Sequence, residues 1–109
     1  MLYVPDRGDI IWIDFNPQRG HEQAKRRPGL VLSPKAYNQK TSLCLLCPMT
    51  SKQKGYPFEV LLKNGDPENV ILSDQVKSLD WKARNAIFKS RASQNVLEEV
   101  IGKFLTLIE

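Results

Sequence analysis

The residues best suited to chemistry lie in one polar stretch, GHEQAKRRPGLVLS, which spans residues 20–33. It holds the chain's only histidine, His21, then Glu22, and it places Arg27 directly before Pro28 and an apolar run. A guanidinium offers a rigid fork of N–H donors that fits phosphate oxygens. Glu22 could face Arg27 across the loop. A stretch of this composition is commonly just a solvated loop, and that interpretation stays open for all of it except Arg27, whose backbone the following strand would hold.

A second candidate, Thr50, lies where the apolar run LCLLCPM ends and the polar, basic segment TSKQKGYP begins. An isolated threonine at a strand end is usually structural. Its hydroxyl becomes relevant to a phosphate only if this strand end meets the 20–33 stretch. Loops at the ends of neighbouring strands in one sheet can share a rim, and such an arrangement would bring Thr50 and Arg27 together.

The C-x-x-C pattern formed by Cys44 and Cys47 lies inside the same apolar run. In a strand, positions i and i+3 point to opposite faces. Three residues of strand also separate the Cα atoms by about 10 Å, which is too far for a disulfide. The chain has no further cysteine. We therefore expect two buried thiols rather than a zinc or redox site, and no metal ligands.

The elements that must position these residues are predicted to be short strands. Residues 16–27 lack apolar periodicity and predict a long loop, and long loops in compact domains are often functional. Residues 34–42 could hold one helical turn, and residues 80–90 a helical turn and a short strand. Runs of β-forming residues bounded by turn residues predict the other strands at residues 9–15, 29–33, 43–49 and 58–62, with one or two more within 70–79.

The end of the chain has a different pattern, because apolar residues recur there with a period of 3.6 and predict an amphipathic helix. Ser93 or Asn95 could cap this helix, and Asn95 with Glu98 has capping-box spacing. Five to seven strands followed by one helix predict a mainly β fold with α: a small, strongly bent sheet or barrel forming one domain over residues 1–109. The apolar positions of the helix are Val96, Leu97, Val100, Ile101, Phe104, Leu105 and Ile108.

Composition is that of a single small domain with a basic balance. The 109 residues include 16 Lys and Arg against 12 Asp and Glu, for a net charge of +4. Such a charge favours a polyanionic partner, most often nucleic acid, although it could serve solubility alone. No segment approaches the roughly 18 apolar residues of a membrane span. Pro5 and early charges interrupt the N-terminal MLYVPDRGD, which is unlike a secretory signal. We expect a cytoplasmic protein.

Several motifs occur together in a specific order. They are G-D-I-x-W at residues 8–12, G-x-E-Q at 20–23, R-P at 27–28, T-x(4)-G-Y-P-F at 50–58 and D-Q-x-K-S-x-D at 74–80. Each is weak alone, but in this order and spacing they are specific. Over nearly its whole length the chain resembles the MazF-type toxins, endoribonucleases of bacterial toxin–antitoxin pairs with a small SH3-like barrel. Within that family it is most similar to the MazF branch.

The resemblance implies roles for individual residues. Arg27 and Thr50 match the catalytic arginine and threonine of the family, and Glu22 matches its loop glutamate. His21 matches the PemK branch, where the histidine of G-H-E-Q contributes to the site. That branch also uses an arginine two positions before the D-Q aspartate, but Leu72 occupies that position here, so an acid–base pair at that point is not expected. The residues implied to bind RNA are Asn38, Lys54, Asp74, Gln75 and Lys77.

The residues themselves suit RNA cleavage without a metal or other cofactor. The 2′-hydroxyl of RNA can attack the adjacent phosphorus once it loses its proton and the phosphate charge is neutralised. This reaction gives a 2′,3′-cyclic phosphate and a 5′-hydroxyl, as the resemblance also implies. Arg27 would stabilise the added negative charge, and Thr50 would fix the phosphate for in-line attack. Glu22 is the candidate base and His21 the second choice, because the high pKa of an arginine makes Arg27 a poor base.

Other side chains would hold the RNA. Unpaired bases are recognised by stacking and by hydrogen bonds to their edges. The aromatic residues that could stack, unless they belong to the core, are Trp12, Phe15, Tyr56 and Trp81. The cations expected to hold the RNA backbone electrostatically are Lys52, Lys54, Lys77 and Arg84.

The residues and the resemblance together predict a sequence-specific, ribosome-independent messenger RNA endonuclease that arrests growth. The resemblance also implies a homodimer and an antitoxin whose acidic, disordered tail lies across the basic surface. Two alternatives stay open: a non-catalytic nucleic-acid-binding module and a gyrase-poisoning toxin of the same fold. The set of Glu22, Arg27 and Thr50 argues against both. The sequence does not indicate which RNA sequence is cut.

Overall fold

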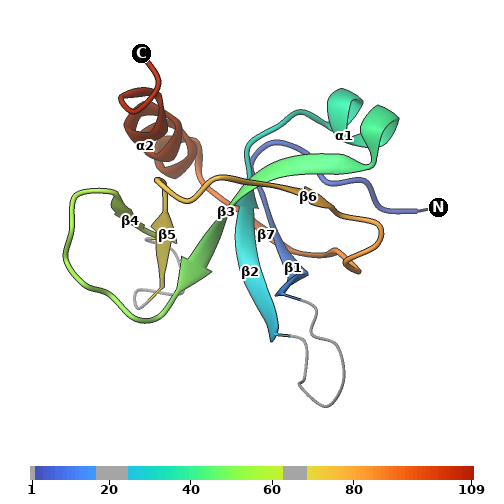
Figure 1. The fold of residues 1–109 in the computed structure, drawn as a ribbon, viewed down its shortest axis with the longest axis horizontal. Coiled ribbons are helices and arrows are strands. Elements are labelled where there is room, and N and C mark those ends of the chain that lie inside the picture. Colours follow the sequence, from blue (N-terminus) through green and yellow to red (C-terminus); the bar gives the residue numbers. More distant parts are fainter. Residues whose placement is uncertain (1, 17–24, 63–68) are drawn as a thin grey trace.

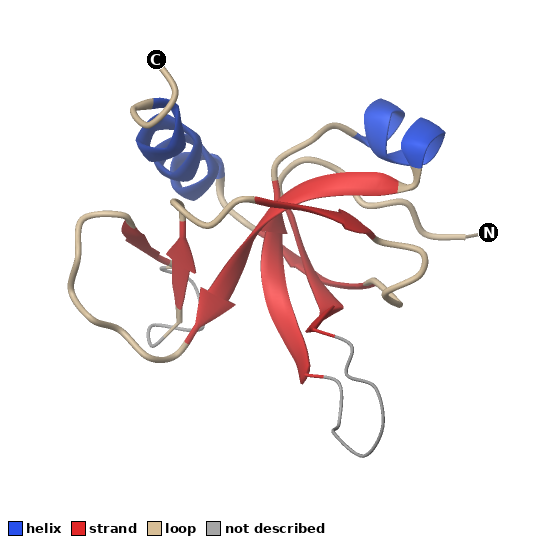
Figure 2. Ribbon diagram, in the orientation of Figure 1, coloured by secondary structure: helices blue, strands red, loops and turns tan. Residues whose placement is uncertain are grey.

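The computed structural model describes residues 2–16, 25–62 and 69–109. The described residues form a central sheet, and two helices lie on separate sides of it (Figures 1 and 2). The elements in chain order are β1 (Asp9–Asn16), β2 (Lys25–Val31), α1 (Lys35–Thr41), β3 (Leu43–Thr50), β4 (Glu59–Leu61), β5 (Val70–Leu72), β6 (Lys77–Asp80), β7 (Ile87–Arg91) and α2 (Gln94–Leu105).

The seven described strands form one antiparallel, strongly bent sheet in the order β4-β5-β3-β2-β1-β7, with β6 also paired to β3. The last strand pairs with the first, so that Asp9 lies opposite Arg91. Among the described strands, β4 and β7 end the path and do not pair with each other, so the sheet is not closed. The prediction of a small, mainly β fold with a C-terminal helix is confirmed, with an open sheet in place of a closed barrel.

Strand β3 is the hub of this sheet because it exchanges partners along its length. Residues Leu43–Leu46 pair with β6, Leu46–Pro48 with β2, and Met49–Thr50 with β5. The connection between β5 and β6, residues 73–76, therefore runs beside the C-terminal half of β3. This connection carries the D-Q motif, and β3 brings its own terminal threonine to the same place.

Both faces of the sheet are buried, which explains why β1 is apolar at successive positions. Ile10 belongs to a cluster of buried residues beneath α2, whereas Ile11 and Ile13 belong to a second cluster around Trp81 on the other face. The two cysteines divide in the same way, Cys47 to the first cluster and Cys44 to the second. The prediction that they are buried on opposite faces is confirmed, and burial raises the pKa of each thiol to about 12.

Helix α2 covers the first cluster through its apolar stripe. Val96, Leu97 and Val100 are buried, whereas the stripe becomes exposed towards its end. Ser93 is the N-cap, since its hydroxyl accepts a hydrogen bond from the Val96 amide at 3.2 Å. The sequence had left Asn95 as the alternative. None of the described helices is long and apolar enough to cross a membrane.

The predicted loop over residues 16–27 is wrong at its C-terminal end, because β2 begins at Lys25. The register pairs Asp14 with Arg26 and Ile13 with Arg27, so both arginines lie on a strand. Cross-strand pairing supplies the order that local apolar periodicity lacks in this segment. Arg27 is therefore the third residue of a strand rather than the last residue of a loop.

Candidate active site: a basic groove around Arg27

Three adjoining hollows, of about 190, 420 and 400 Å³, share one residue, Arg27. We call them together the Arg27 groove. Strands β1 to β6 contribute to it, together with the loop between β3 and β4. The residues that line it are Phe15, Arg27, Pro28, Pro48, Thr50, Ser51, Lys52, Lys54, Tyr56, Glu59, Asn69, Leu72, Gln75, Lys77 and Leu79.

The sheet register explains why Arg27 and Thr50 meet. Strand β2 pairs antiparallel with β3 so that Gly29 lies opposite Pro48 and Leu30 opposite Cys47. Continuing this register by two residues places Arg27 opposite Thr50, and both residues line the same two hollows. The end of the strand that carries Thr50 therefore meets the segment that carries Arg27, as a role for Thr50 at a phosphate requires. Neighbouring strands of one sheet bring the two side chains to a shared groove.

Arg27 differs from its neighbours in having a free guanidinium within the described part of the chain. The side chain of Arg26, one position away, donates to Asp14 Oδ1 at 2.8 Å and to the Asn85 carbonyl at 2.7 Å. The other described arginines, Arg7, Arg84 and Arg91, also donate from their side chains to protein oxygens. Arg27 is exposed and makes no such contact among the described residues, so its donors are available to a ligand.

Thr50 takes part in a local turn in which its hydroxyl proton has no acceptor among the described residues. Thr50 Oγ1 accepts a hydrogen bond from the Lys52 amide at 3.1 Å. A hydroxyl that accepts in this way still has one O–H to donate. The turn therefore fixes the position of the oxygen, and the proton remains able to bond to a phosphate oxygen in the groove.

The lining of the groove carries more positive than negative charge. Lys52, Lys54 and Lys77 line it beside Arg27. Glu59 also lines it, whereas Asp74 is not among the lining residues and contacts one of them, Tyr56. The Glu59 carboxylate accepts two backbone N–H groups. Asp74 Oδ1 accepts from the Tyr56 hydroxyl at 2.9 Å. Partial burial, followed by this hydrogen bond and the charge of Asp74, raises the pKa of Tyr56, so Tyr56 stays a neutral donor.

The close approach of strands at Gly29 shapes one side of the groove. A Cβ built on Gly29 would lie 2.6 Å from Leu46 Cδ1, 3.0 Å from Phe15 Cζ and 3.2 Å from the Cys47 carbonyl oxygen. The absence of a side chain at this position lets the Phe15 ring lie across β2. Phe15 then lines the hollow that also contains Arg27 and Lys77.

The structure does not bring every predicted site residue to the groove. Asn38 is fully buried, and its amide nitrogen donates to the Pro5 and Ser33 carbonyls at 2.8 and 3.0 Å. The prediction that Asn38 contacts RNA is corrected to a structural role, because a side chain with 0% exposure has no surface to offer. It organises the start of α1 instead.

Arg84 is also placed differently from the prediction. Its Nη1 donates to the Asp14 and Phe15 carbonyls at 3.0 and 2.7 Å, and it does not line the groove. The guanidinium holds the end of β1 in place rather than reaching towards a ligand. Two further predicted residues, His21 and Glu22, lie outside the described residues.

The aromatic residues divide between the core and the groove. Trp81 is buried, and its indole N–H donates to the Asn38 carbonyl at 2.9 Å. Trp12 is 36% exposed, does not line the groove, and lies beneath the ammonium group of Lys89. Phe15 and Tyr56 are the two candidates that line the groove, and they are therefore the ones placed to contact a base.

Sequence reasoning missed Glu59 and Asn69, which also line the groove. Neither residue lies in a sequence pattern that indicated a catalytic or binding role. A signal for Glu59 was nonetheless present, because an acidic residue follows Gly55 by four positions, after a polar loop that needs an acceptor for its backbone N–H groups.

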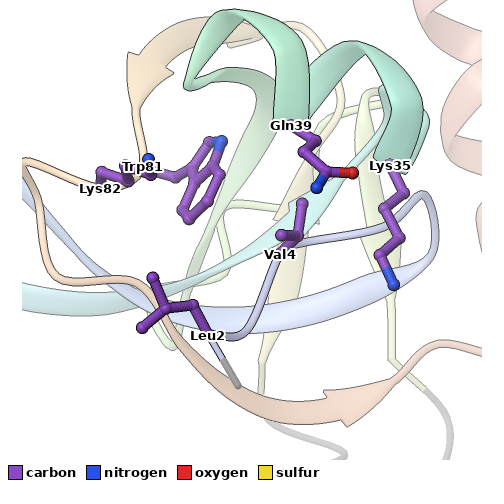
Figure 3. A pocket seen from close by; sticks show the side chains of 6 residues that line it. All are labelled: Leu2, Val4, Lys35, Gln39, Trp81 and Lys82. Carbon is purple, nitrogen blue, oxygen red and sulfur yellow. The ribbon is translucent and has the colours of Figure 1, made fainter.

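A separate hollow of about 410 Å³ lies between α1 and the turn after β6 (Figure 3). Leu2, Val4 and Trp81 form its apolar walls, and Lys35 and Lys82 stand at its edge. It shares no lining residue with the Arg27 groove. It contains neither Arg27 nor Thr50, and we do not assign the reaction to it. Within residues 2–16, 25–62 and 69–109, no group of three or more His, Cys, Asp or Glu side chains could hold a metal ion.

Comparison with known proteins identifies the family of this chain. A family described as the PemK-like, MazF-like toxin of type II toxin–antitoxin systems matches residues 6–108. The endoribonuclease toxin MazF of Escherichia coli strain K12 is 50% identical over 106 residues, which cover 97% of this chain and 96% of that protein. The endoribonuclease toxin ChpB of the same strain is 34% identical over 110 residues, covering 95% of this chain and 94% of that protein.

Solved structures give the same result. The crystal structure of MazF from Deinococcus radiodurans is 51% identical, with a TM-score of 0.87 and 97% of each chain covered. A MazE–MazF complex from that organism is 51% identical, with a TM-score of 0.91 and 97% and 96% of the two chains covered. The chain belongs to the PemK-like, MazF-like family of toxins of type II toxin–antitoxin systems. Its enzyme class is that of an endoribonuclease.

Proposed function

We propose that the Arg27 groove binds single-stranded RNA and cleaves it by attack of a 2′-hydroxyl on the adjacent phosphorus, without a metal ion. The products are a 2′,3′-cyclic phosphate and a 5′-hydroxyl. The observation that carries this proposal is the unengaged guanidinium of Arg27, which lies opposite Thr50 in a groove lined by three lysines. RNA supplies the nucleophile itself, so the protein needs mainly to neutralise charge and to orient the phosphate.

Arg27 and Thr50 divide this work. As the 2′-oxygen adds, negative charge accumulates on the non-bridging oxygens of the phosphorane. The planar fork of Arg27 can donate two parallel hydrogen bonds to these oxygens. The Thr50 hydroxyl, held by the Lys52 amide, donates a further hydrogen bond that fixes the phosphate for in-line displacement of the 5′-oxygen.

A base must remove the 2′-hydroxyl proton, and we assign this role to Glu22, with His21 as the second candidate. Both precede β2 by a few residues, and β2 holds Arg27 in the groove. A carboxylate or a neutral imidazole can accept a proton at neutral pH, whereas a guanidinium cannot. A Glu22→Gln variant that cleaves normally while His21→Gln does not would reverse the assignment.

The rest of the groove suits a single-stranded substrate. Lys52, Lys54 and Lys77 provide sequence-independent attraction to the phosphate backbone. Phe15 and Tyr56 supply faces on which unpaired bases can stack, and Gln75 and Asp74 offer hydrogen bonds to base edges. Because duplex RNA presents no accessible base faces, cleavage is expected to be confined to unpaired sites in messenger RNA. Contacts to base edges would make cleavage depend on sequence. We expect it to require no ribosome. Loss of the cut messenger RNA would arrest translation and growth.

End-group analysis tests this proposal directly. The purified protein is incubated with a single-stranded RNA of mixed sequence in EDTA, and the product ends are identified by mass spectrometry. Products with 2′,3′-cyclic phosphate and 5′-hydroxyl ends support the proposed reaction. Cleavage that stops in EDTA, or that leaves 5′-phosphate ends, would refute it. A non-hydrolysable analogue in which a 2′-methoxy group replaces each 2′-hydroxyl should stay intact under the same conditions.

We also propose a homodimer and an antitoxin partner with an acidic tail. The related MazF of Deinococcus radiodurans has been solved in complex with MazE, which supports a cognate antitoxin for this chain. Carboxylates of such a tail would compete with RNA phosphates for the groove, so binding should weaken with salt and exclude RNA. We propose a cytoplasmic location, where messenger RNA and such an antitoxin would meet this protein.

Two measurements examine these partners. Light scattering at micromolar protein concentration should give twice the mass of the chain, and a monomer would contradict the dimer. Increasing amounts of an acidic antitoxin peptide should abolish cleavage, and cleavage that persists at saturation would show that the peptide binds elsewhere.

A further inference from the structure

The loop between β3 and β4 is the least regular part of the Arg27 groove that the structure describes. Residues 51–58 contain no helix or strand, and most of them are exposed. They nevertheless carry Lys52, Lys54 and Tyr56 into the groove. Holding such a loop in one conformation costs backbone entropy at each residue. Specific contacts must offset that cost if the two ammonium groups are to meet a phosphate at fixed positions.

Glu59 supplies these contacts from the first residue of β4. Its Oε2 accepts a hydrogen bond from the Lys54 amide at 2.8 Å, and its Oε1 accepts one from the Gly55 amide at 2.9 Å. Hydrogen bonds to an ionised acceptor are stronger than those between neutral groups. The Glu59 carboxylate thus closes the loop into a hydrogen-bonded ring at Lys54, which carries one of the two ammonium groups.

The backbone at Gly55 is shaped for this ring. Gly55 has a φ of +80°, and no atom lies within 4 Å of the position where its Cβ would be. The requirement for glycine here is therefore conformational rather than steric. The left-handed conformation turns two successive N–H groups towards one anion, and Glu59 is the anion that they meet.

The outer end of the loop is attached to the C-terminal helix. Lys103 Nζ, on α2, donates to the Pro57 carbonyl at 2.5 Å and lies 3.5 Å from the Glu59 carbonyl. It also lies 3.5 Å from Glu99 Oε2 one helical turn earlier. Lys103 thus connects the loop to a helix that is packed on the buried cluster.

We propose that Glu59 is a positioning residue for the RNA cleavage reaction: it clasps the Lys54 and Gly55 amides and so holds the loop that presents Lys52 and Lys54 to the RNA backbone, with Lys103 anchoring the clasp to α2. The inference rests on the proposed function of the groove. Glu59 does not take part in bond making or breaking, because its two oxygens are occupied by the loop.

The sign of the effect of Glu59→Gln separates this proposal from simple electrostatics. The substitution removes a negative charge from the rim of a groove that binds a polyanion, which by charge alone should tighten RNA binding. A glutamine can accept at only one oxygen, so one clasped amide is lost and the loop is released. Loss of positioning should instead raise KM by about fivefold, the factor that one net hydrogen bond of about 1 kcal/mol represents.

The experiment compares Glu59→Gln with Glu98→Gln, which makes the same charge change on the exposed face of α2, where Glu98 contacts only Gln94 among the described side chains. KM and kcat are measured on a short fluorogenic single-stranded RNA. Amide hydrogen exchange is measured by NMR on the RNA-free protein. We expect Glu59→Gln to raise KM with kcat nearly unchanged and to lose protection at the Lys54 and Gly55 amides, and Glu98→Gln to do neither.

A lower or unchanged KM in Glu59→Gln, or unchanged exchange at both amides, would overturn the proposal. The exchange measurement needs no RNA, so it reports on the clasp even if the wild-type protein fails to cleave the substrate, a result that would instead refute the proposed function. Lys103→Met gives a second test should Glu59→Gln unfold. It should raise KM in the same direction, and Lys103→Arg, which keeps a cationic donor, should restore it.

Discussion

The adjacent arginines of β2, Arg26 and Arg27, allow a substitution at one to serve as the control for the same substitution at the other. Arg26 and Arg27 share a strand and a chemical type, but their contacts differ, and the proposed mechanism gives a catalytic role to Arg27 alone. Arg27 is exposed and makes no side-chain hydrogen bond among the described residues, whereas Arg26 donates to Asp14 and to the Trp12 and Asn85 carbonyls. Arg27→Ala should therefore remove catalysis without loss of stability, and Arg26→Ala should do the reverse.

The magnitudes follow from these contacts. In the proposed mechanism Arg27→Ala removes the donors to the developing phosphorane charge, so kcat should fall by about 10²-fold or more, while stability changes by less than about 0.5 kcal/mol. Arg26→Ala removes one ion pair with Asp14 at 2.8 Å, in which the two side chains are 34% and 13% exposed, and two hydrogen bonds to carbonyls. After solvent screening we expect a loss of about 1 kcal/mol, or about 4 °C in melting temperature, with cleavage retained.

The assay is a cleavage time course, a thermal melt and an RNA titration on the same three proteins. Arg27→Lys should recover little activity, because an ammonium cannot reproduce the planar fork. RNA affinity of Arg27→Ala should decrease only modestly, since Lys52, Lys54 and Lys77 remain. Near-normal cleavage by Arg27→Ala would refute the mechanism. A large loss of melting temperature in that variant would show that Arg27 is structural.

Three further predictions concern the framework. Gly29→Ala should destabilise the protein by about 1–3 kcal/mol in chemical denaturation, because the new Cβ would meet Leu46, Phe15 and the Cys47 carbonyl; Gly102→Ala, where nothing lies within 4 Å, is the control and should not destabilise. Ser93→Ala should lower the free energy of unfolding by about 1 kcal/mol through loss of the α2 N-cap, and Ser93→Asp should retain most of the wild-type stability. Equal melting temperatures for the wild type and both variants would show that the cap does not contribute to stability. Burial raises the pKa of Cys44 and Cys47 from 9.0 to about 12, so stability from these thiols is complete below pH 9 and is lost as pH rises from 9 towards 12; iodoacetamide at pH 8 should label them only after unfolding, and rapid labelling of the native protein would contradict their burial.

Much of the fold was predictable because its elements have local patterns. The apolar strands, the helical stripe that begins after Ser93 and the opposite faces of Cys44 and Cys47 all follow from periods of 2 and 3.6 residues. The start of β2 was not predictable in this way. Lys25, Arg26 and Arg27 are strand residues because β1 pairs with them, and pairing between two strands leaves no periodic pattern of apolar residues in a polar segment.

The site was predictable to the extent that it depends on a motif or on one sheet register. Arg27 and Thr50 meet because β2 and β3 are neighbours, and their family motifs identify them. Asn38 shows the limit of the motif alone, since a polar residue can be retained for a buried hydrogen-bond network as well as for a ligand. Glu59 shows the opposite limit, because its partners are backbone amides that no side-chain pattern reveals.

The pairing of the first strand with the last has a consequence for how this protein is made. Asp9 lies opposite Arg91 in the sheet, and their side chains form an ion pair across 82 positions of sequence. During synthesis, residues are added over seconds from the N-terminus, so Arg27 and Thr50 leave the ribosome well before β7 can join β1. A nascent chain thus carries the proposed catalytic pair, Arg27 and Thr50, on an incomplete sheet. We expect the ribosome that makes this nuclease to finish translation before its product can attack the messenger that encodes it.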